Sequence, residues 1–359
     1  MLEFSVPMPF YKEHIYILIS LNKEVKKSII KSFYFSLPKN SPDLTGFEQG
    51  RFYFNFETDF EYWKPLIEYS LNNGFEFIYL LNSPKIYNPE NDNFKKQLEK
   101  LDRLINNLKS TGCNKVRICN PQLMEFINQE YPGVEMYKNI KEFVPSWNLN
   151  KNFSFLKNIK KRFPYIKIEL MVNEGCVPAC PLRTSHNIFI TNLLNKNLNS
   201  IFSGQFYLSK CTNLMNKNIP WYLCNSNIIY PWEIKEYLKI GINNFKLVGR
   251  NSPEFNTGKY LNYYKYYLKG IDDIKNIINI PIKYFNNYIA HNENINYTVK
   301  EIKPYLTDIK HFIKYGDLCT SRCGRECNYC NKCAEKIQKL FLNEEKKKTI
   351  RTTPFCVLD

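Results

Sequence analysis

FEFIYLLNS, residues 75–83, is a short run of aromatic and aliphatic side chains, which is typical of a buried strand. A second run of this kind is KVRICN (115–120). Between them, NDNFKKQLEKLDRLINNLKSTG (91–112) carries apolar residues at helical spacing, namely Phe94, Leu98, Leu101, Leu104, Ile105 and Leu108. Strand, helix and strand with short connections predict a parallel β/α unit, because parallel strands need a crossover between them.

The same alternation extends along most of the chain. Further runs that predict buried strands are KSFYFSLP (31–38), IKIELMVN (166–173), PWYLCNS (220–226) and NNFKLVGR (243–250). Helical patterns lie at 120–130, 230–241, 298–314 and 333–347. Because there is no glycine-rich dinucleotide motif, these strands favour an α/β fold with a TIM-barrel-like parallel β/α core over a Rossmann sheet.

The distribution of strands and cysteines also predicts how the chain divides. We expect an N-terminal segment at 1–45, a barrel-like domain at 46–275 and a helical, cysteine-rich C-terminal extension at 276–359. The strand signal fades after about residue 275, which sets the second boundary.

Composition and charge narrow the class of protein. With 44% hydrophobic and 16% aromatic residues, the 359-residue chain can build a sizeable core, so disorder is not expected. No run approaches the roughly 18 apolar residues of a membrane helix, and residues 1–14 lack the features of a signal peptide. We therefore expect a cytoplasmic protein without membrane contact. The net charge of +16 suits RNA as a partner, although scattered lysines also follow from AT-rich coding.

Four cysteines lie in the middle of the chain, at or near predicted strand ends. NEGCVPACPLRTSHN (173–187) carries Cys176 and Cys180, Cys211 lies in a predicted loop, and Cys224 lies near the end of the predicted strand 220–226. In barrel enzymes the C-terminal strand ends meet at one mouth, so these thiols can converge. Their scattered spacing favours an iron–sulfur cluster over zinc, and buried thiols without a ligand are the remaining alternative.

Five more cysteines crowd into LCTSRCGRECNYCNKC (318–333), at positions Cys319, Cys323, Cys327, Cys330 and Cys333. Such crowding in a reducing compartment favours metal binding over disulfides. The sequence therefore predicts a second metal site, which holds either a 4Fe-4S cluster or zinc. Which four of the five cysteines bind stays open. The CxxxCxxC spacing within this stretch is that of radical-SAM enzymes, but its place after the barrel argues against that identity.

Five further residues are candidates for chemistry near these thiols. Glu174 can act as a base or cap a helix. Lys246 and Arg250 follow the last predicted strand and can bind a substrate carboxylate or phosphate, or form an ion pair on the barrel rim. Arg183 and His186 can donate hydrogen bonds to cluster sulfurs or to substrate, or serve only the structure.

NEGCVPACPLRTSH (173–186), taken with IPWYLCNSNIIYPWEIKEYLKIGINNFKLVGR (219–250), resembles peptidase family U32, the collagenase-like proteins. The resemblance covers about residues 47–275, with Val248 where the family usually has Glu. It implies a barrel-like fold. For members with the cysteine set it also implies a 4Fe-4S cluster, held here by Cys176, Cys180, Cys211 and Cys224.

The resemblance implies oxygen-independent hydroxylation as the nearest known activity. We therefore predict a redox enzyme that modifies RNA or a small carboxylate substrate and works with an electron-transfer partner or a second U32-type protein. A peptidase of the U32 type is one alternative, although the sequence has no HExxH, G-x-S-x-G or P-loop motif. A non-catalytic electron-transfer or scaffold partner is the other, and a Schiff-base lyase built on Lys246 is a more distant one.

Overall fold

The structure is a computed structural model of the chain. It describes residues 1–37, 41–43, 45, 59–82, 92–113, 115–118, 123–125, 129, 142–173, 180, 218–248, 260–285, 295–321 and 326–347. Within these ranges, residues 92–93, 95, 316–321 and 343–347 are described by their backbone alone.

One parallel sheet forms the centre of the described chain, with the strand order β4-β3-β2-β1-β7-β6-β5. Its strands are β1 (Leu2–Pro7), β2 (Ser28–Phe35), β3 (Glu76–Leu81), β4 (Lys115–Ile118), β5 (Glu142–Phe143), β6 (Lys167–Met171) and β7 (Asn244–Lys246). All six pairings are parallel, and the register places Ser5 beside both Ser32 and Lys246. The predicted parallel β/α core is therefore confirmed.

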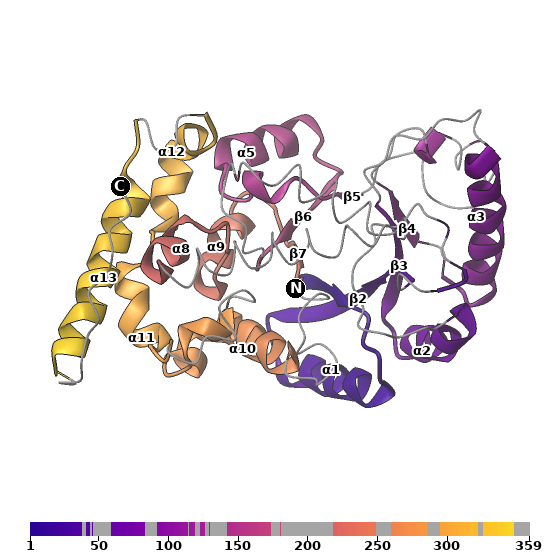
Figure 1. The fold of residues 1–359 in the computed structure, drawn as a ribbon, viewed down its shortest axis with the longest axis horizontal. Helices are drawn as coiled ribbons and strands as arrows, with labels where there is room; N and C mark the ends of the chain where they lie inside the picture. The colour runs from indigo at the N-terminus through magenta and orange to yellow at the C-terminus, as the bar shows by residue number, and fades with distance from the viewer. Residues whose placement is uncertain are drawn as a thin grey trace.

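The sheet curls into a half-barrel that resembles part of a TIM barrel (Figure 1). The strands β4 and β5 stand at opposite ends of the strand order, six strand spacings apart, or roughly 29 Å in a flat sheet. Nevertheless, Nη2 of Arg117 on β4 lies 3.1 Å from Oε2 of Glu142 on β5. One side chain can span this gap only because the two edges of the sheet curl toward each other.

Alternate residues of each strand point to opposite faces of the sheet. The convex face carries the main core, which includes Phe4, Phe33, Phe77, Leu170 and Phe245, all of them buried. The rings of Phe4 and Phe245 stack across neighbouring strands with centroids 5.6 Å apart. The neighbouring positions on the strands face the concave side, where most of the side chains are polar.

Helices cover the convex face and extend the molecule beyond the sheet. They are α1 (Lys12–Glu24), α2 (Phe60–Asn72), α3 (Asp92–Ser110), α5 (Phe153–Arg162), α8 (Ile219–Asn225), α9 (Ile234–Leu238), α10 (Tyr260–Asp272), α11 (Val299–Ile302), α12 (Ile309–Ser321) and α13 (Tyr329–Lys347). Short 3-10 turns are η1 (Trp147–Leu149), η3 (Pro231–Glu233), η5 (Ile274–Ile277), η6 (Ile282–Phe285) and η7 (Lys303–Tyr305). Helices α11, α12 and α13 form the predicted helical C-terminal extension (Figure 1).

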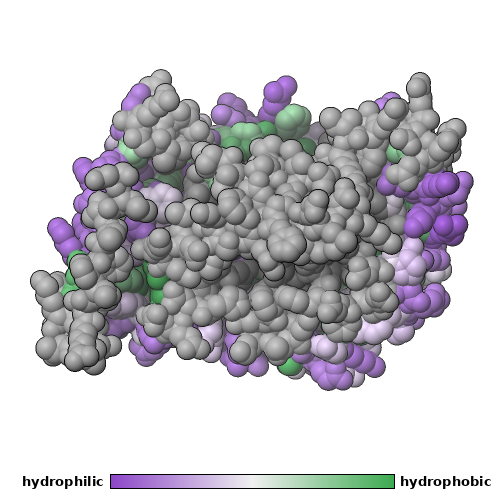
Figure 2. Space-filling view, in the orientation of Figure 1, coloured by the Kyte–Doolittle hydropathy of each residue, from purple (hydrophilic) through white to green (hydrophobic). Residues whose placement is uncertain are grey.

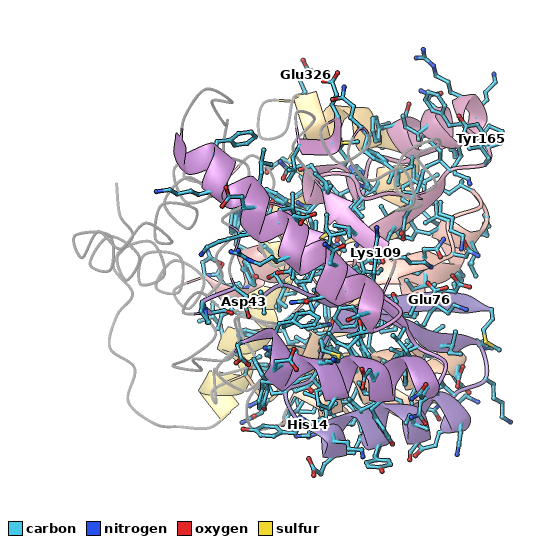
Figure 3. The ribbon with its side chains drawn as sticks, turned by 90° about the vertical axis from the view of Figure 1, so that its right-hand side faces the viewer. His14, Asp43, Glu76, Lys109, Tyr165 and Glu326 are labelled. Atoms are coloured by element: carbon cyan, nitrogen blue, oxygen red, sulfur yellow. The ribbon has the colours of Figure 1, made fainter. Side chains whose placement is uncertain are left out.

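Helix α3 lies across the outside of the sheet, with α1 and α2 below it (Figure 3). Gly112 follows α3 with φ +84°, a left-handed conformation that glycine adopts without strain, and it turns the chain into β4. The two rims of the sheet lie on opposite sides of this view (Figure 3). One rim is marked by Glu76 at the start of β3, and the other by Asp43, which follows the end of β2.

One predicted strand is wrong: PWYLCNS (220–226) forms helix α8. Asn218 caps this helix, because its side chain accepts a hydrogen bond from the backbone N–H of Trp221 at 3.2 Å, and Pro220 lies in the first turn. A short apolar run is compatible with a buried helix as well as with a strand. Residues 1–45, which the sequence set apart, supply β1 and β2 of the sheet.

Hydrophilic side chains cover the end of the molecule formed by α3, at the right of Figure 2. Among the described residues, no helix combines the length and the apolar character needed to cross a bilayer.

Candidate functional site on the concave face

Four charged side chains meet on the concave face, each from a different strand. Arg117 of β4 donates to Oε2 of Glu169 on β6 over 2.7 Å, and it also pairs with Glu142 of β5. Lys246 of β7 lies near both carboxylates, close enough to influence their pKa values. Glu169 is only 3% exposed and Lys246 only 8%. Charged residues this deeply buried are rare unless they are paired, so the arrangement marks a candidate functional site.

The strand pattern explains why these side chains face one another. Ile168 and Leu170 point into the main core, so Glu169 between them must point to the concave side. In the same way Phe245 is buried in the main core, and its neighbour Lys246 faces the opposite direction. Each of these charged residues thus alternates along its strand with apolar residues that pack the sheet against its helices.

Lys246 also lies over an aromatic ring. Its Nζ is 3.8 Å from the centroid of the Tyr34 ring, which is a favourable position for a cation. The Tyr34 hydroxyl donates a 2.8 Å hydrogen bond to the carbonyl of Leu247, which fixes the position of the ring below the ammonium group. Tyr34 packs with Ile78 and Leu80 in a small apolar cluster beside the charges. This apolar wall makes the electrostatic interactions of the cluster stronger than they would be in water.

The two carboxylates respond differently to this environment. Burial by itself would raise the pKa of Glu169, but the charges of Arg117 and Lys246 outweigh burial and hold that pKa below its ordinary value. For Glu142 burial prevails over the attraction of Arg117, and the nearby Glu169 carboxylate adds to it, so the pKa of Glu142 is raised. The side chain of Glu142 is 35% exposed, which makes it the accessible carboxylate of the pair.

Half of the residues that the sequence singled out lie outside the described residues: Glu174, Cys176, Arg183, His186, Cys211, Arg250 and Cys323. Lys246 lies in the concave-face cluster, where its charge acts on Glu142 and Glu169. Cys180 is a half-buried free thiol, and Cys319 belongs to α12, where only the backbone is described. The proposed metal ligands therefore stay predictions.

Cys224 lies in α8, which packs along α13, the helix that carries Cys330 and Cys333. Its place is therefore beside the C-terminal cysteines and not on a strand end. Within the described residues, no three Cys, His, Asp or Glu side chains lie close enough together to hold a metal ion as they stand.

Comparison with known proteins gives one relative along the whole chain. MJ1657, an uncharacterised protease of Methanocaldococcus jannaschii, is 22% identical over 373 residues, which cover 94% of this chain and 99% of the relative. The solved structure of the U32 peptidase Mk0906 matches with a TM-score of 0.38 at 10% identity, over 69% of this chain and 92% of that one. This chain resembles peptidase family U32. No protein-family model matches the sequence.

The U32 resemblance that the sequence predicted is thus confirmed, but sequence reasoning missed most of the concave-face cluster. Arg117, Glu142 and Glu169 were not among the candidates. Two of them carried a readable signal, because Arg117 in KVRICN and Glu169 in IKIELMVN are charged residues with an apolar residue on each side. A charge at such a position needs a partner inside the fold.

Proposed function

We propose that this chain is a peptidase of the U32 type and that the concave face of its sheet is the active site. The full-length relative bears the name of a protease, which supports a hydrolytic role. The observation that carries the proposal is the network of Arg117, Glu142, Glu169 and Lys246, in which Glu142 alone is well exposed, because clusters of mutually perturbed charges are typical of active sites.

The network contains the groups that peptide hydrolysis needs. A base must take a proton from the attacking water, and cations or N–H donors must stabilise the oxyanion that forms. Glu142 is the accessible carboxylate with a raised pKa, which suits a general base that later returns the proton to the leaving amine. Arg117 and Lys246 supply the positive charge. Glu169 acts as a positioning residue, because it holds the guanidinium of Arg117 from the opposite strand.

Cleavage of fluorescein-labelled gelatin and casein by the full chain tests this proposal. Glu142→Gln and Lys246→Met should each lower the cleavage rate by a factor of about 100 or more, the range expected for loss of a general base or an oxyanion cation. Glu76→Gln is the matched control, since Glu76 is a half-exposed carboxylate that pairs with Lys115 over 2.7 Å at the other rim. Cleavage that survives Glu142→Gln would exclude this site.

A second candidate is redox modification of RNA or a small carboxylate by an iron–sulfur enzyme. It is favoured by the concentration of cysteines, twelve in the whole chain. The cations Lys246 and Arg117 would then bind the substrate carboxylate, and the net charge of +16 would attract RNA. Iron and acid-labile sulfide measured after anaerobic purification test this second candidate, and their absence would exclude it. RNA binding should also weaken steeply with added salt, and binding that ignores salt would count against an RNA substrate.

A further inference from the structure

Helices α8 and α13 meet outside the sheet, and cysteines line their contact. The indole Nε1 of Trp221 on α8 donates a 3.1 Å hydrogen bond to Oδ1 of Asn331 on α13. Cys224 lies one turn beyond Trp221 in α8. In α13, Cys330 directly precedes Asn331, and Cys333 follows it by two residues. Cys224 and Cys333 both belong to the buried core, and Cys330 packs against it. The two helices thus bring together thiols that are about a hundred residues apart in sequence.

Three cysteines lie at the start of α13, and we call Cys327, Cys330 and Cys333 the α13 cysteines, although Cys327 precedes the first helical residue by two positions. They repeat every third residue, the CxxC spacing that lets two thiolates bind one metal. The last two lie within the first turns of the helix, three residues apart and so on one face. The N-terminal end of a helix also stabilises thiolates, which are the form of cysteine that binds metals.

Hydrogen-bonding side chains surround the α13 cysteines. Nε2 of His311 lies 3.6 Å from Sγ of Cys327, and its ring stacks on Tyr329 with centroids 3.8 Å apart. The hydroxyl of Tyr329 is hydrogen-bonded to Cys333 and accepts a 2.7 Å bond from the backbone N–H of Asp308. Hydrogen-bond donors next to thiolates orient them and stabilise their negative charge.

Positive charge lies next to these thiols. Lys151 is only 5% exposed, its Nζ donates to the carbonyl of Ser226 over 3.1 Å, and its charge acts on Cys224. Lys336 acts in the same way on Cys333 from the next turn of α13. A metal with four thiolate ligands carries net negative charge, and a buried site of this type needs compensating cations.

We propose that Cys224 and the α13 cysteines form one thiolate site for a thiophilic metal, either a zinc ion or an iron–sulfur cluster, which joins α8 to α13. The thiols do not converge as they stand, so metal binding must draw them together by rotation about χ1. This grouping differs from the two-site arrangement that the sequence predicted, because Cys224 leaves the mid-chain set. It is independent of the peptidase proposal, since the peptidase site lies on the strands of the sheet and this site lies on helices.

Metal analysis of the full chain tests the shared site. The chain is purified anaerobically and reconstituted once with zinc and once with iron and sulfide, and metal and acid-labile sulfide are then measured. The variants are Cys224→Ala, which leaves no polar atom buried, Cys330→Ser at a half-buried position, and the double variant. Cys113→Ser is the control, because Cys113 is a buried thiol that bonds to the carbonyl of Phe77 behind the sheet. Circular dichroism confirms that each variant folds.

A shared site predicts non-additive losses. Cys224→Ala, Cys330→Ser and the double variant should all lose the same amount of metal, and Cys113→Ser should lose none. Zinc without sulfide would identify a zinc site, and iron with sulfide would identify a cluster; either supports the proposal. Separate losses that add up in the double variant, or an unchanged metal content in Cys330→Ser, would overturn it. Wild type that takes up neither metal would overturn it as well.

Discussion

Arg117 and Glu169 are joined by a 2.7 Å hydrogen bond, although β3, β2, β1 and β7 lie between their strands in the sheet. The bond crosses the hollow of the half-barrel, so it reports the curl of the sheet directly. It also places a cation and a carboxylate where water has little access, because the Glu169 side chain is 4% exposed and that of Arg117 16%. The same interaction thus joins the two sides of the curled sheet and lies at the centre of the candidate site.

Removal of the guanidinium should destabilise the protein strongly. Arg117→Met leaves the carboxylate of Glu169 buried without its main partner, and breaking a buried ion pair in this way costs about 3–5 kcal/mol. Denaturant unfolding followed by circular dichroism measures this change in the free energy of unfolding. The double variant Arg117→Met with Glu169→Met should recover much of the loss, since it removes the stranded charge as well.

The control for this prediction is an exposed ion pair on the same sheet. Lys31 lies 3.8 Å from Glu76, and both side chains are more than a third exposed. Lys31→Met should change the free energy of unfolding by less than about 1 kcal/mol, as exposed pairs do. If Arg117→Met were as mild as Lys31→Met, the buried network would have no structural role.

Glu233 should make stability depend on pH. This residue is 2% exposed, and its carboxylate accepts a 2.8 Å hydrogen bond from the backbone N–H of Tyr230. Burial raises the pKa of Glu233 from 4.5 to about 7, with Lys151 opposing the shift and Asp308 adding to it. Between these values the folded chain keeps a proton that the unfolded chain has released. The stability from this group is therefore complete below pH 4.5 and falls as pH rises to 7, by up to about 3 kcal/mol.

Glu233→Gln tests this dependence, because glutamine can accept the same hydrogen bond and does not ionise. Unfolding measured between about pH 5 and about pH 8 should show a flatter profile for the variant, which should be the more stable protein at the upper end. Parallel profiles for the variant and wild type would mean that Glu233 keeps an ordinary pKa.

Much of the sheet could be predicted from the sequence, and the exceptions have physical reasons. The strands β3, β4, β6 and β7 lie within predicted runs, and β2 overlaps the run at 31–38 but begins three residues earlier, at Ser28. These strands were predictable because their convex positions carry large apolar residues. β1 was missed because Glu3 and Ser5 alternate with its apolar residues, whereas the predicted strands are nearly continuous apolar runs. β5 has only two residues, too few to show any periodicity.

The candidate site was harder to predict than the strands. A charge within an apolar strand, such as Glu169, shows that a partner must exist but not which residue it is. The partner of Glu169 is Arg117, and their contact depends on how far the sheet curls, which no local pattern encodes. In the same way Cys224 was placed on a strand, because PWYLCNS has no decisive period and its helical state comes with packing against α13.

Gly270 in α10 should not tolerate a side chain. A Cβ built there would lie 2.6 Å from Cδ1 of Ile277 and 3.1 Å from Cβ of Pro231, so the helix sits too close to its neighbours for a methyl group. Gly270→Ala should lower the free energy of unfolding by about 1–3 kcal/mol, even though alanine favours helices by up to about 1 kcal/mol. Ile277→Val in the same chain shortens the clashing side chain and should restore part of the loss. Thermal unfolding of the two single variants and the double variant measures this coupling. A stabilised Gly270→Ala variant would show that α10 is free to move away from η3 and η5.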